Sequence, residues 1–101
     1  MAKETPRKEE RSENTVLIGR KPVMNYVIAC LTFFNSNAEK VMVKARGRAI
    51  SRAVDTVELL RRAFVKNVEI NIEIGTEEIT REDNRRSNVS TIEIALAKSK
   101  E

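Results

Sequence analysis

The chain of 101 residues carries 19 basic and 15 acidic side chains, and its length suits one domain with a modest hydrophobic core. One cysteine and no histidine exclude an internal disulfide, the usual zinc sites and His-dependent catalytic triads, so we expect neither an enzyme nor a metal or other cofactor. The excess positive charge lies in residues 16–64, where nine basic and three acidic residues give a local net charge of +6, typical of proteins that meet phosphates.

The N-terminal region has the composition of a disordered tail. Residues 1–14 contain four basic and four acidic side chains but no apolar cluster that could anchor them. They also lack the apolar stretch of a secretory signal, and the longest uncharged run, residues 22–38, is shorter than the roughly 20 apolar residues of a membrane span. We therefore expect a cytoplasmic protein that makes no membrane contact.

Two short strands with a helix between them are predicted next. Residues 15–19, TVLIG, and residues 41–45, VMVKA, are mainly apolar runs, which indicates strands buried on both faces. Pro22 is well placed for the first turn of the helix. One face of that helix gathers the side chains Tyr26, Val27, Cys30, Phe33 and Phe34. A helix that joins two such strands predicts a right-handed crossover with the strands parallel.

A second helix is predicted over residues 48–64. Its apolar stripe consists of Ile50, Ala53, Val54, Val57, Leu60 and Phe64. Ala49, Thr56 and Ala63 widen the stripe beyond the ~100° that covers one core. The surplus width predicts a second buried contact, and hence a dimer.

Two alternating strands complete the chain. Residues 68–74 and 92–96 alternate apolar and polar side chains, which is typical of strands with one buried face. The polar segment 80–88 between them contains Asp83 and Asn84, which suit a turn. The order is therefore strand, helix, strand, helix, strand, strand, an α/β domain over residues 15–98 with a short C-terminal tail at 99–101.

Three motifs, VLIGRKPVMNYV, VKARGRAISRAVDTVE and NVSTIEIA, together resemble the Alba family of small archaeal chromatin and RNA-binding proteins. The resemblance extends over residues 16–98. It implies an α+β two-layer sandwich with a mixed four-stranded sheet, like the C-terminal domain of bacterial translation initiation factor three. It also implies a homodimer that binds double-stranded DNA and RNA with little sequence preference and extends its hairpins as arms.

The segment KARGR is the first candidate binding site. It joins the second strand to the second helix, so we expect an exposed loop in which Gly47 allows a turn or a close approach of the backbone. A helix N-terminus attracts phosphate, and Lys44, Arg46 and Arg48 add cations beside it. The alternative for these residues is a solvated surface that only keeps the protein soluble.

The resemblance implies a second site before the first helix. Arg20 and Lys21 are similar to a basic pair that the family lays on the nucleic-acid backbone, and Asn25 follows within a turn. In the family, the first residue of the pair is usually a lysine whose acetylation weakens DNA binding. Because an arginine occupies that position here, acetyl control is expected to be lost or to act at Lys21 or Lys44.

Two further contacts are implied by the resemblance. Arg85 and Arg86 at the hairpin tip would follow the minor groove, although the added acids Glu82 and Asp83 are expected to weaken this contact. Leu60 and Phe64 on the second helix are expected to form contacts within or between dimers on DNA.

The leading functional hypothesis is a nucleoid-associated protein that coats or compacts chromosomal DNA. The alternative is an RNA-binding protein or RNA chaperone, or a subunit of an RNA-processing complex. Aromatic residues make up 4% of the chain and fall on apolar helix faces, so no stacking platform for single strands is expected. A nuclease would need clustered acids; Asp55 and Glu58 come nearest, and Glu58 is better explained as a helix partner of Arg62.

Overall fold

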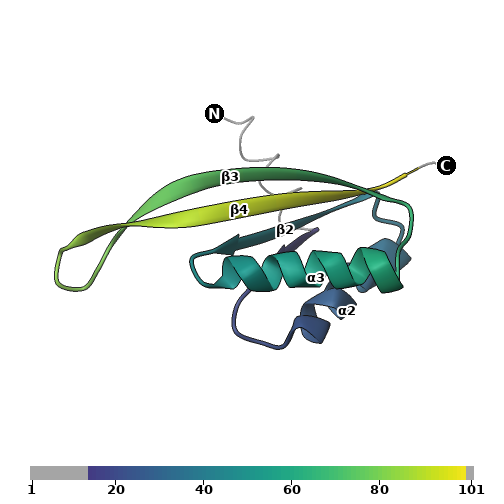
Figure 1. Ribbon diagram of the computed structural model, residues 1–101, viewed down its shortest axis with the longest axis horizontal. Coiled ribbons are helices and arrows are strands. Elements are labelled where there is room, and N and C mark those ends of the chain that lie inside the picture. The colour runs from purple at the N-terminus through teal and green to yellow at the C-terminus, as the bar shows by residue number, and fades with distance from the viewer. Residues whose placement is uncertain (1–13, 100–101) are drawn as a thin grey trace.

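The computed structural model describes residues 14–99 and folds them as six elements in the predicted order. They are β1 (Thr15–Leu17), α2 (Val23–Asn35), β2 (Lys40–Arg46), α3 (Ala49–Ala63), β3 (Val68–Thr80) and β4 (Arg86–Lys98). Figure 1 shows their arrangement. Apart from Asn14 and Ser99, the predicted tails at 1–14 and 99–101 lie outside the described residues.

The strands form one mixed sheet in the order β1-β2-β4-β3. β1 pairs with β2 in parallel, with Val16 opposite Val43, whereas β4 is antiparallel to both β2 and β3. Both helices pack on one face of the sheet, and no element of residues 14–99 covers the other face (Figure 1). The α+β two-layer sandwich and the parallel crossover from β1 to β2 are thus confirmed.

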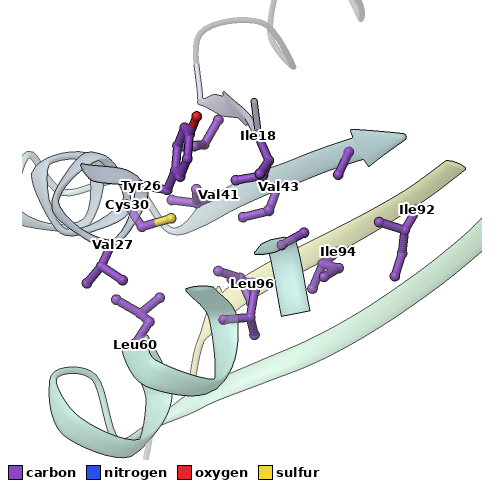
Figure 2. Packing of buried hydrophobic residues seen from close by; sticks show 14 of the residues in the cluster. Ile18, Tyr26, Val27, Cys30, Val41, Val43, Leu60, Ile92, Ile94 and Leu96 are labelled. Atoms are coloured by element: carbon purple, nitrogen blue, oxygen red, sulfur yellow. The ribbon is translucent and has the colours of Figure 1, made fainter. Parts of the chain in front are cut away.

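The hydrophobic core lies between the helices and the sheet (Figure 2). The buried residues that face the helices from the sheet are Ile18, directly after β1, and the strand residues Val16, Val41, Val43, Ala45, Ile92, Ile94 and Leu96. Val27 and Cys30 from α2 and Leu60 from α3 close over them. Because only one face of the sheet is covered, Leu17 is 71% exposed, so the prediction of a first strand buried on both faces is wrong.

The apolar stripe of α3 is wider than its contact with the core, as the sequence predicts. Its buried centre consists of Ala53, Thr56, Val57 and Leu60, so the prediction that Val54 belongs to the centre and Thr56 to the margin is wrong. At its margin, Val54 is 42% exposed, and Ile72 and Ile74 of the edge strand β3 are exposed as well. Ile50 of α3 and Ile74 of β3 line one shallow groove. The fold therefore leaves an apolar surface along α3 and β3 uncovered in the single chain.

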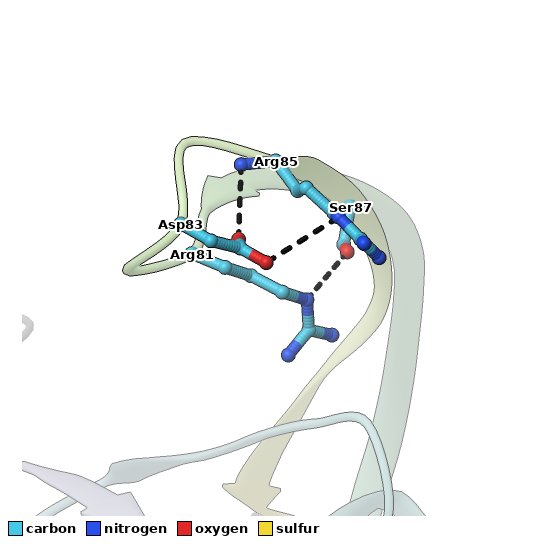
Figure 3. A network of polar contacts seen from close by, with 4 residues as sticks. All are labelled: Arg81, Asp83, Arg85 and Ser87. Carbon is cyan, nitrogen blue, oxygen red and sulfur yellow. Dashed lines mark hydrogen bonds and ion pairs between the residues drawn. The ribbon is translucent and has the colours of Figure 1, made fainter.

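β3 and β4 form a hairpin that projects beyond the other strands (Figure 1). β2 ends at Arg46, opposite Thr91, so residues 86–90 of β4 pair only with residues 76–80 of β3. We call residues 76–90 the arm. At its tip, Asn84 adopts a φ of +67°, which asparagine tolerates better than most residues. The tip is closed by its own side chains, since Oδ1 of Asp83 accepts a hydrogen bond from the backbone N–H of Arg85 (Figure 3).

Candidate nucleic-acid interface

Two connections and the arm meet at one end of the sheet. β1 and β2 are parallel, so the segments that follow them, residues 18–22 and 47–48, lie at the same end. β4 is antiparallel to β2, so the arm projects from that end too (Figure 1). We call this region the basic end and define it by Arg20, Lys21, Arg46, Gly47, Arg48, Arg85 and Arg86.

The connection after β1 presents two free cations. Arg20 and Lys21 are exposed, and neither side chain has a hydrogen-bond or ion-pair partner within residues 14–99. Asn25 is exposed on the first turn of α2. Tyr26 is only 8% exposed, as a core residue should be, and its hydroxyl oxygen accepts hydrogen bonds from the backbone N–H groups of Gly19 (2.9 Å) and Lys21 (3.0 Å).

The connection after β2 is shorter than the KARGR motif predicts. Lys44 and Arg46 belong to β2, and because Ala45 between them is buried against the helices, their side chains lie on the uncovered face of the sheet. Only Gly47 and Arg48 form the connection. Gly47 adopts a φ of +60° and donates its N–H to the carbonyl of Ser90, 2.9 Å away, while Arg48 is exposed and has no side-chain partner within residues 14–99.

The remaining predicted cations contact carboxylates. Near the end of β2, Lys44 lies 3.7 Å from Glu93, and Arg46 lies 3.1 Å from Glu77 in the arm. At the arm itself, Arg85 lies 3.3 Å from Asp83 and Arg86 lies 3.6 Å from Glu78. The sequence points to the acids of the tip as partners of these cations but does not single out Glu77, Glu78 or Glu93. Glu93 falls in a predicted strand, but Glu77 and Glu78 lie past the predicted end of the third strand at residue 74, because β3 continues to Thr80. Only the register shows which cation each of them meets.

Arg52 is a further residue that sequence reasoning missed. It lies on α3, one turn after Arg48, and is half-buried. Its Nη1 donates a hydrogen bond of 2.8 Å to the carbonyl oxygen of Gly19 in the other connection. The four-residue spacing from Arg48 placed both arginines on one helix face, and this was the available signal.

Asp55 and Glu58 of α3 are the two acids that come nearest to a metal site in the sequence. Within residues 14–99, no group of three or more His, Cys, Asp and Glu side chains is arranged to hold a metal ion. Glu58 contacts Arg61 at 3.1 Å, three residues on, so the predicted pairing with Arg62 is wrong. Burial raises the pKa of the Cys30 thiol from 9.0 to about 11, which keeps it unreactive near neutral pH.

The two residues predicted to form intersubunit contacts, Leu60 and Phe64, differ in their exposure to solvent. Leu60 is completely buried beneath α3 in the single chain, so it has no surface to offer a second chain, and its assignment as a contact residue is corrected to a core residue. Phe64 caps the C-terminus of α3, at the opposite end of that helix from Arg48, and is 47% exposed. It remains a candidate contact.

The fold and the basic end define a small two-layer α+β protein that carries cations on two connections and on a projecting hairpin. Residues 14–76 match the model of the Alba family. The chain is 55% identical over 85 residues to the "DNA/RNA-binding protein Alba" of Methanocella arvoryzae, covering 83% of this chain and 88% of the relative. It is 57% identical over 88 residues to "DNA/RNA-binding protein Alba 1" of Archaeoglobus fulgidus, covering 86% and 98%.

Solved structures agree with this likeness. Alba from Thermoplasma volcanium superposes with a TM-score of 0.80 at 45% identity, covering 84% of this chain and all of that one. ALBA1 from Trypanosoma brucei superposes with a TM-score of 0.66 at 27% identity, covering 86% of this chain and 70% of that one. The chain belongs to the Alba family, as its three motifs predict.

Proposed function

We propose that the protein binds double-stranded DNA and RNA through the phosphate backbone, with little sequence preference, and coats chromosomal DNA in the nucleoid. The observation that carries this proposal is the placement of Arg20, Lys21 and Arg48. They are exposed and unpaired within residues 14–99, and they lie together at the end from which the arm projects. Cations that neutralise phosphates release condensed counterions without reading the base sequence.

The names of the relatives support nucleic-acid binding, and the positions of the aromatic residues support binding of duplexes over single strands. The curated relatives are named as DNA/RNA-binding proteins, which favours binding of both nucleic acids. Single-strand binders stack bases on exposed aromatic rings. Here Tyr26 and Phe34 are buried, Phe33 is half-buried, and Phe64 lies at the far end of α3, so the basic end has no such ring.

The proposed active form is a homodimer joined along the exposed apolar surface of α3 and β3. Light scattering would report the dimer. Ile74→Asp places a charge in this surface and should dissociate the dimer. Leu17→Asp is the matched control, because Leu17 is similarly exposed, at 71% against 81%, but lies on the uncovered face of the sheet. A monomeric wild-type protein at micromolar concentration would contradict the proposed dimer.

The test of the proposed function is competition between labelled duplex DNA and duplex RNA across a salt series. Between about 50 and 200 mM salt, the logarithm of affinity should fall linearly with the logarithm of salt concentration, with equal slopes for unrelated sequences. A strong sequence dependence would contradict backbone binding. Consistent preference for duplex RNA would favour the alternative, a subunit of an RNA-processing complex. Incubation with magnesium should leave both duplexes intact.

A further inference from the structure

The connection that carries Arg20 and Lys21 is held by one side chain from each helix. Tyr26 of α2 accepts hydrogen bonds at its hydroxyl from the backbone N–H of Gly19 and of Lys21. Arg52 of α3 donates to the carbonyl of Gly19 at 2.8 Å. Tyr26 is anchored in the core, and Arg52 is half-buried, so both fixed points belong to the rigid body of the protein.

These three hydrogen bonds account for the polar restraints on the middle of the connection, residues 19–21, whereas its ends are held by the backbone, through Ile18 N–H to the carbonyl of Lys44 and Asn25 N–H to the carbonyl of Pro22. Within residues 14–99, no other hydrogen bond or ion pair involves Gly19, Arg20 or Lys21. A connection without them would have to be ordered when it binds, and that ordering lowers affinity. The hydrogen bonds therefore impose the conformation before any ligand arrives.

We propose that Tyr26 and Arg52 are positioning residues that preorganise Arg20 and Lys21 for contact with a phosphate backbone. Arg52 lies one turn after Arg48 on α3, so its bond to Gly19 also ties the two cationic connections together at a fixed spacing. This role rests on the proposed function, in which Arg20 and Lys21 contact phosphates. The fixed spacing suits an array of phosphates whose own spacing is set by a regular duplex.

A direct phosphate contact is the competing role for Arg52. Its guanidinium has five N–H donors, of which Nη1 is engaged with Gly19, and no carboxylate pairs with it within residues 14–99. The two roles differ in thermodynamic coupling. A positioning residue acts only through Arg20 and Lys21, whereas a phosphate contact contributes whether or not those cations are present.

A double-mutant cycle separates these roles. We expect Arg52→Met to lower duplex affinity about tenfold in the wild-type background and less than about twofold in an Arg20→Ala/Lys21→Ala background. Arg62→Met is the matched control: it removes the same charge from the same helix, roughly 15 Å along its axis, and Arg62 is exposed without a partner within residues 14–99. That control should bind within about twofold of wild type.

The outcomes of the cycle are distinct. If the effect of Arg52→Met is undiminished in the Arg20→Ala/Lys21→Ala background, Arg52 contacts phosphate directly and the positioning role is overturned, while the proposed function stands. If Arg20→Ala/Lys21→Ala binds as tightly as wild type, the proposed contact at these cations is overturned and the positioning role with it.

Tyr26→Phe provides a second readout, because it removes the hydroxyl acceptor and keeps the buried ring. In the free protein, amide hydrogen exchange of Gly19 and Lys21 should accelerate about tenfold or more, while the amide of Val27 inside α2 keeps its rate. Duplex affinity should fall with an unchanged salt slope, because the same phosphates are contacted at a higher ordering cost. Unchanged exchange at Gly19 and Lys21, or faster exchange with wild-type affinity, would overturn the positioning role of Tyr26.

Discussion

The cations of the basic end fall into two groups, those without an ion-pair partner within residues 14–99 and those paired with a carboxylate. In the connections after β1 and β2, Arg20, Lys21 and Arg48 are exposed and unpaired within residues 14–99, whereas Arg85 and Arg86 of the arm each contact a carboxylate. Exposed ion pairs contribute only about 0.2–1 kcal/mol to stability, so the arm does not need these pairs to fold. They do lower the positive potential that a phosphate meets. Readiness to bind phosphate thus depends on the acid opposite each arginine, as well as on the number of arginines.

The largest effect is expected from Arg48→Ala, which removes an unpaired cation from the connections. Loss of a charge-assisted hydrogen bond of about 1.5 kcal/mol should weaken binding to every duplex roughly tenfold. The salt slope should fall by about one unit. Fluorescence anisotropy with two unrelated sequences measures both quantities.

Controls for Arg48→Ala come from the same chain. Arg62→Ala, near the far end of α3, removes one charge without touching the basic end and should change affinity little. The reaction of Cys30 with thiol reagents near neutral pH tests whether each variant is folded. In a folded variant it should be slow, because burial raises the pKa of the thiol to about 11. A loss confined to one duplex sequence would show that Arg48 reads bases and would refute the backbone assignment.

The next largest effect is a gain. Glu77→Gln/Glu78→Gln releases Arg46 and Arg86 from their ion pairs and should tighten duplex binding about fivefold at low salt, with little gain at high salt. The free energy of unfolding should fall by less than about 1 kcal/mol per lost pair. Titration at two salt concentrations and chemical denaturation test the two statements.

The charge-matched control for this gain is Glu69→Gln/Glu73→Gln. Both residues are exposed on the same strand, neither has an ion-pair partner within residues 14–99, and both lie outside the arm. If the two double variants raise duplex affinity equally, the change in net charge alone is responsible. That result would contradict the conclusion that the ion pairs of Arg46 and Arg86 limit phosphate binding.

Local sequence patterns predicted most of the fold. Apolar periods of two and 3.6 residues located the strands and helices, and the parallel crossover then placed the two connections at one end of the sheet. The pairing of the cations was beyond such patterns. Arg46 meets Glu77, 31 residues away across β4, and Arg52 reaches Gly19, 33 residues away. Contacts between such distant residues depend on strand register and helix packing, which no local period specifies.

The apolar stripe of α3 shows the same limit at smaller scale. The spacing of its apolar residues indicated which face of the helix is apolar. Only the packing against the sheet shows that the side chain of Leu60 is buried in the core and that Phe64 lies past the last turn of the helix. The stripe was therefore correct as a face, and Leu60 belongs to it as a core residue and not as an intersubunit contact.

A smaller effect is expected at the far end of α3, away from both groups of cations. Phe64→Ala should leave the dimer and the affinity for a short duplex unchanged, because Phe64 lies outside the basic end. On a long duplex, loss of apolar contact between neighbouring dimers should reduce cooperativity about threefold or more. Comparing short and long duplexes measures this. Reduced affinity for the short duplex would place Phe64 in the interface with nucleic acid.

The smallest effect concerns two lysines, one of which is unpaired within residues 14–99 while the other contacts a carboxylate. Lys21 is exposed and unpaired within residues 14–99, whereas Lys44 is half-buried and contacts Glu93, which lies directly opposite Glu73 in the β3–β4 register. Lys21→Gln, which removes the charge as acetylation does, should weaken duplex binding about two- to threefold at physiological salt, while Lys21→Arg should bind as wild type.

Lys44→Gln should instead lower the free energy of unfolding by a few tenths of a kcal/mol, because it leaves the like charges of Glu73 and Glu93 facing each other without a cation. Mass spectrometry of the native protein should accordingly find any regulatory acetyl group on Lys21. If Gln and Arg at position 21 bind equally well at every salt concentration, Lys21 is not a charge switch, and an unpaired cation at the basic end is not sufficient for phosphate contact.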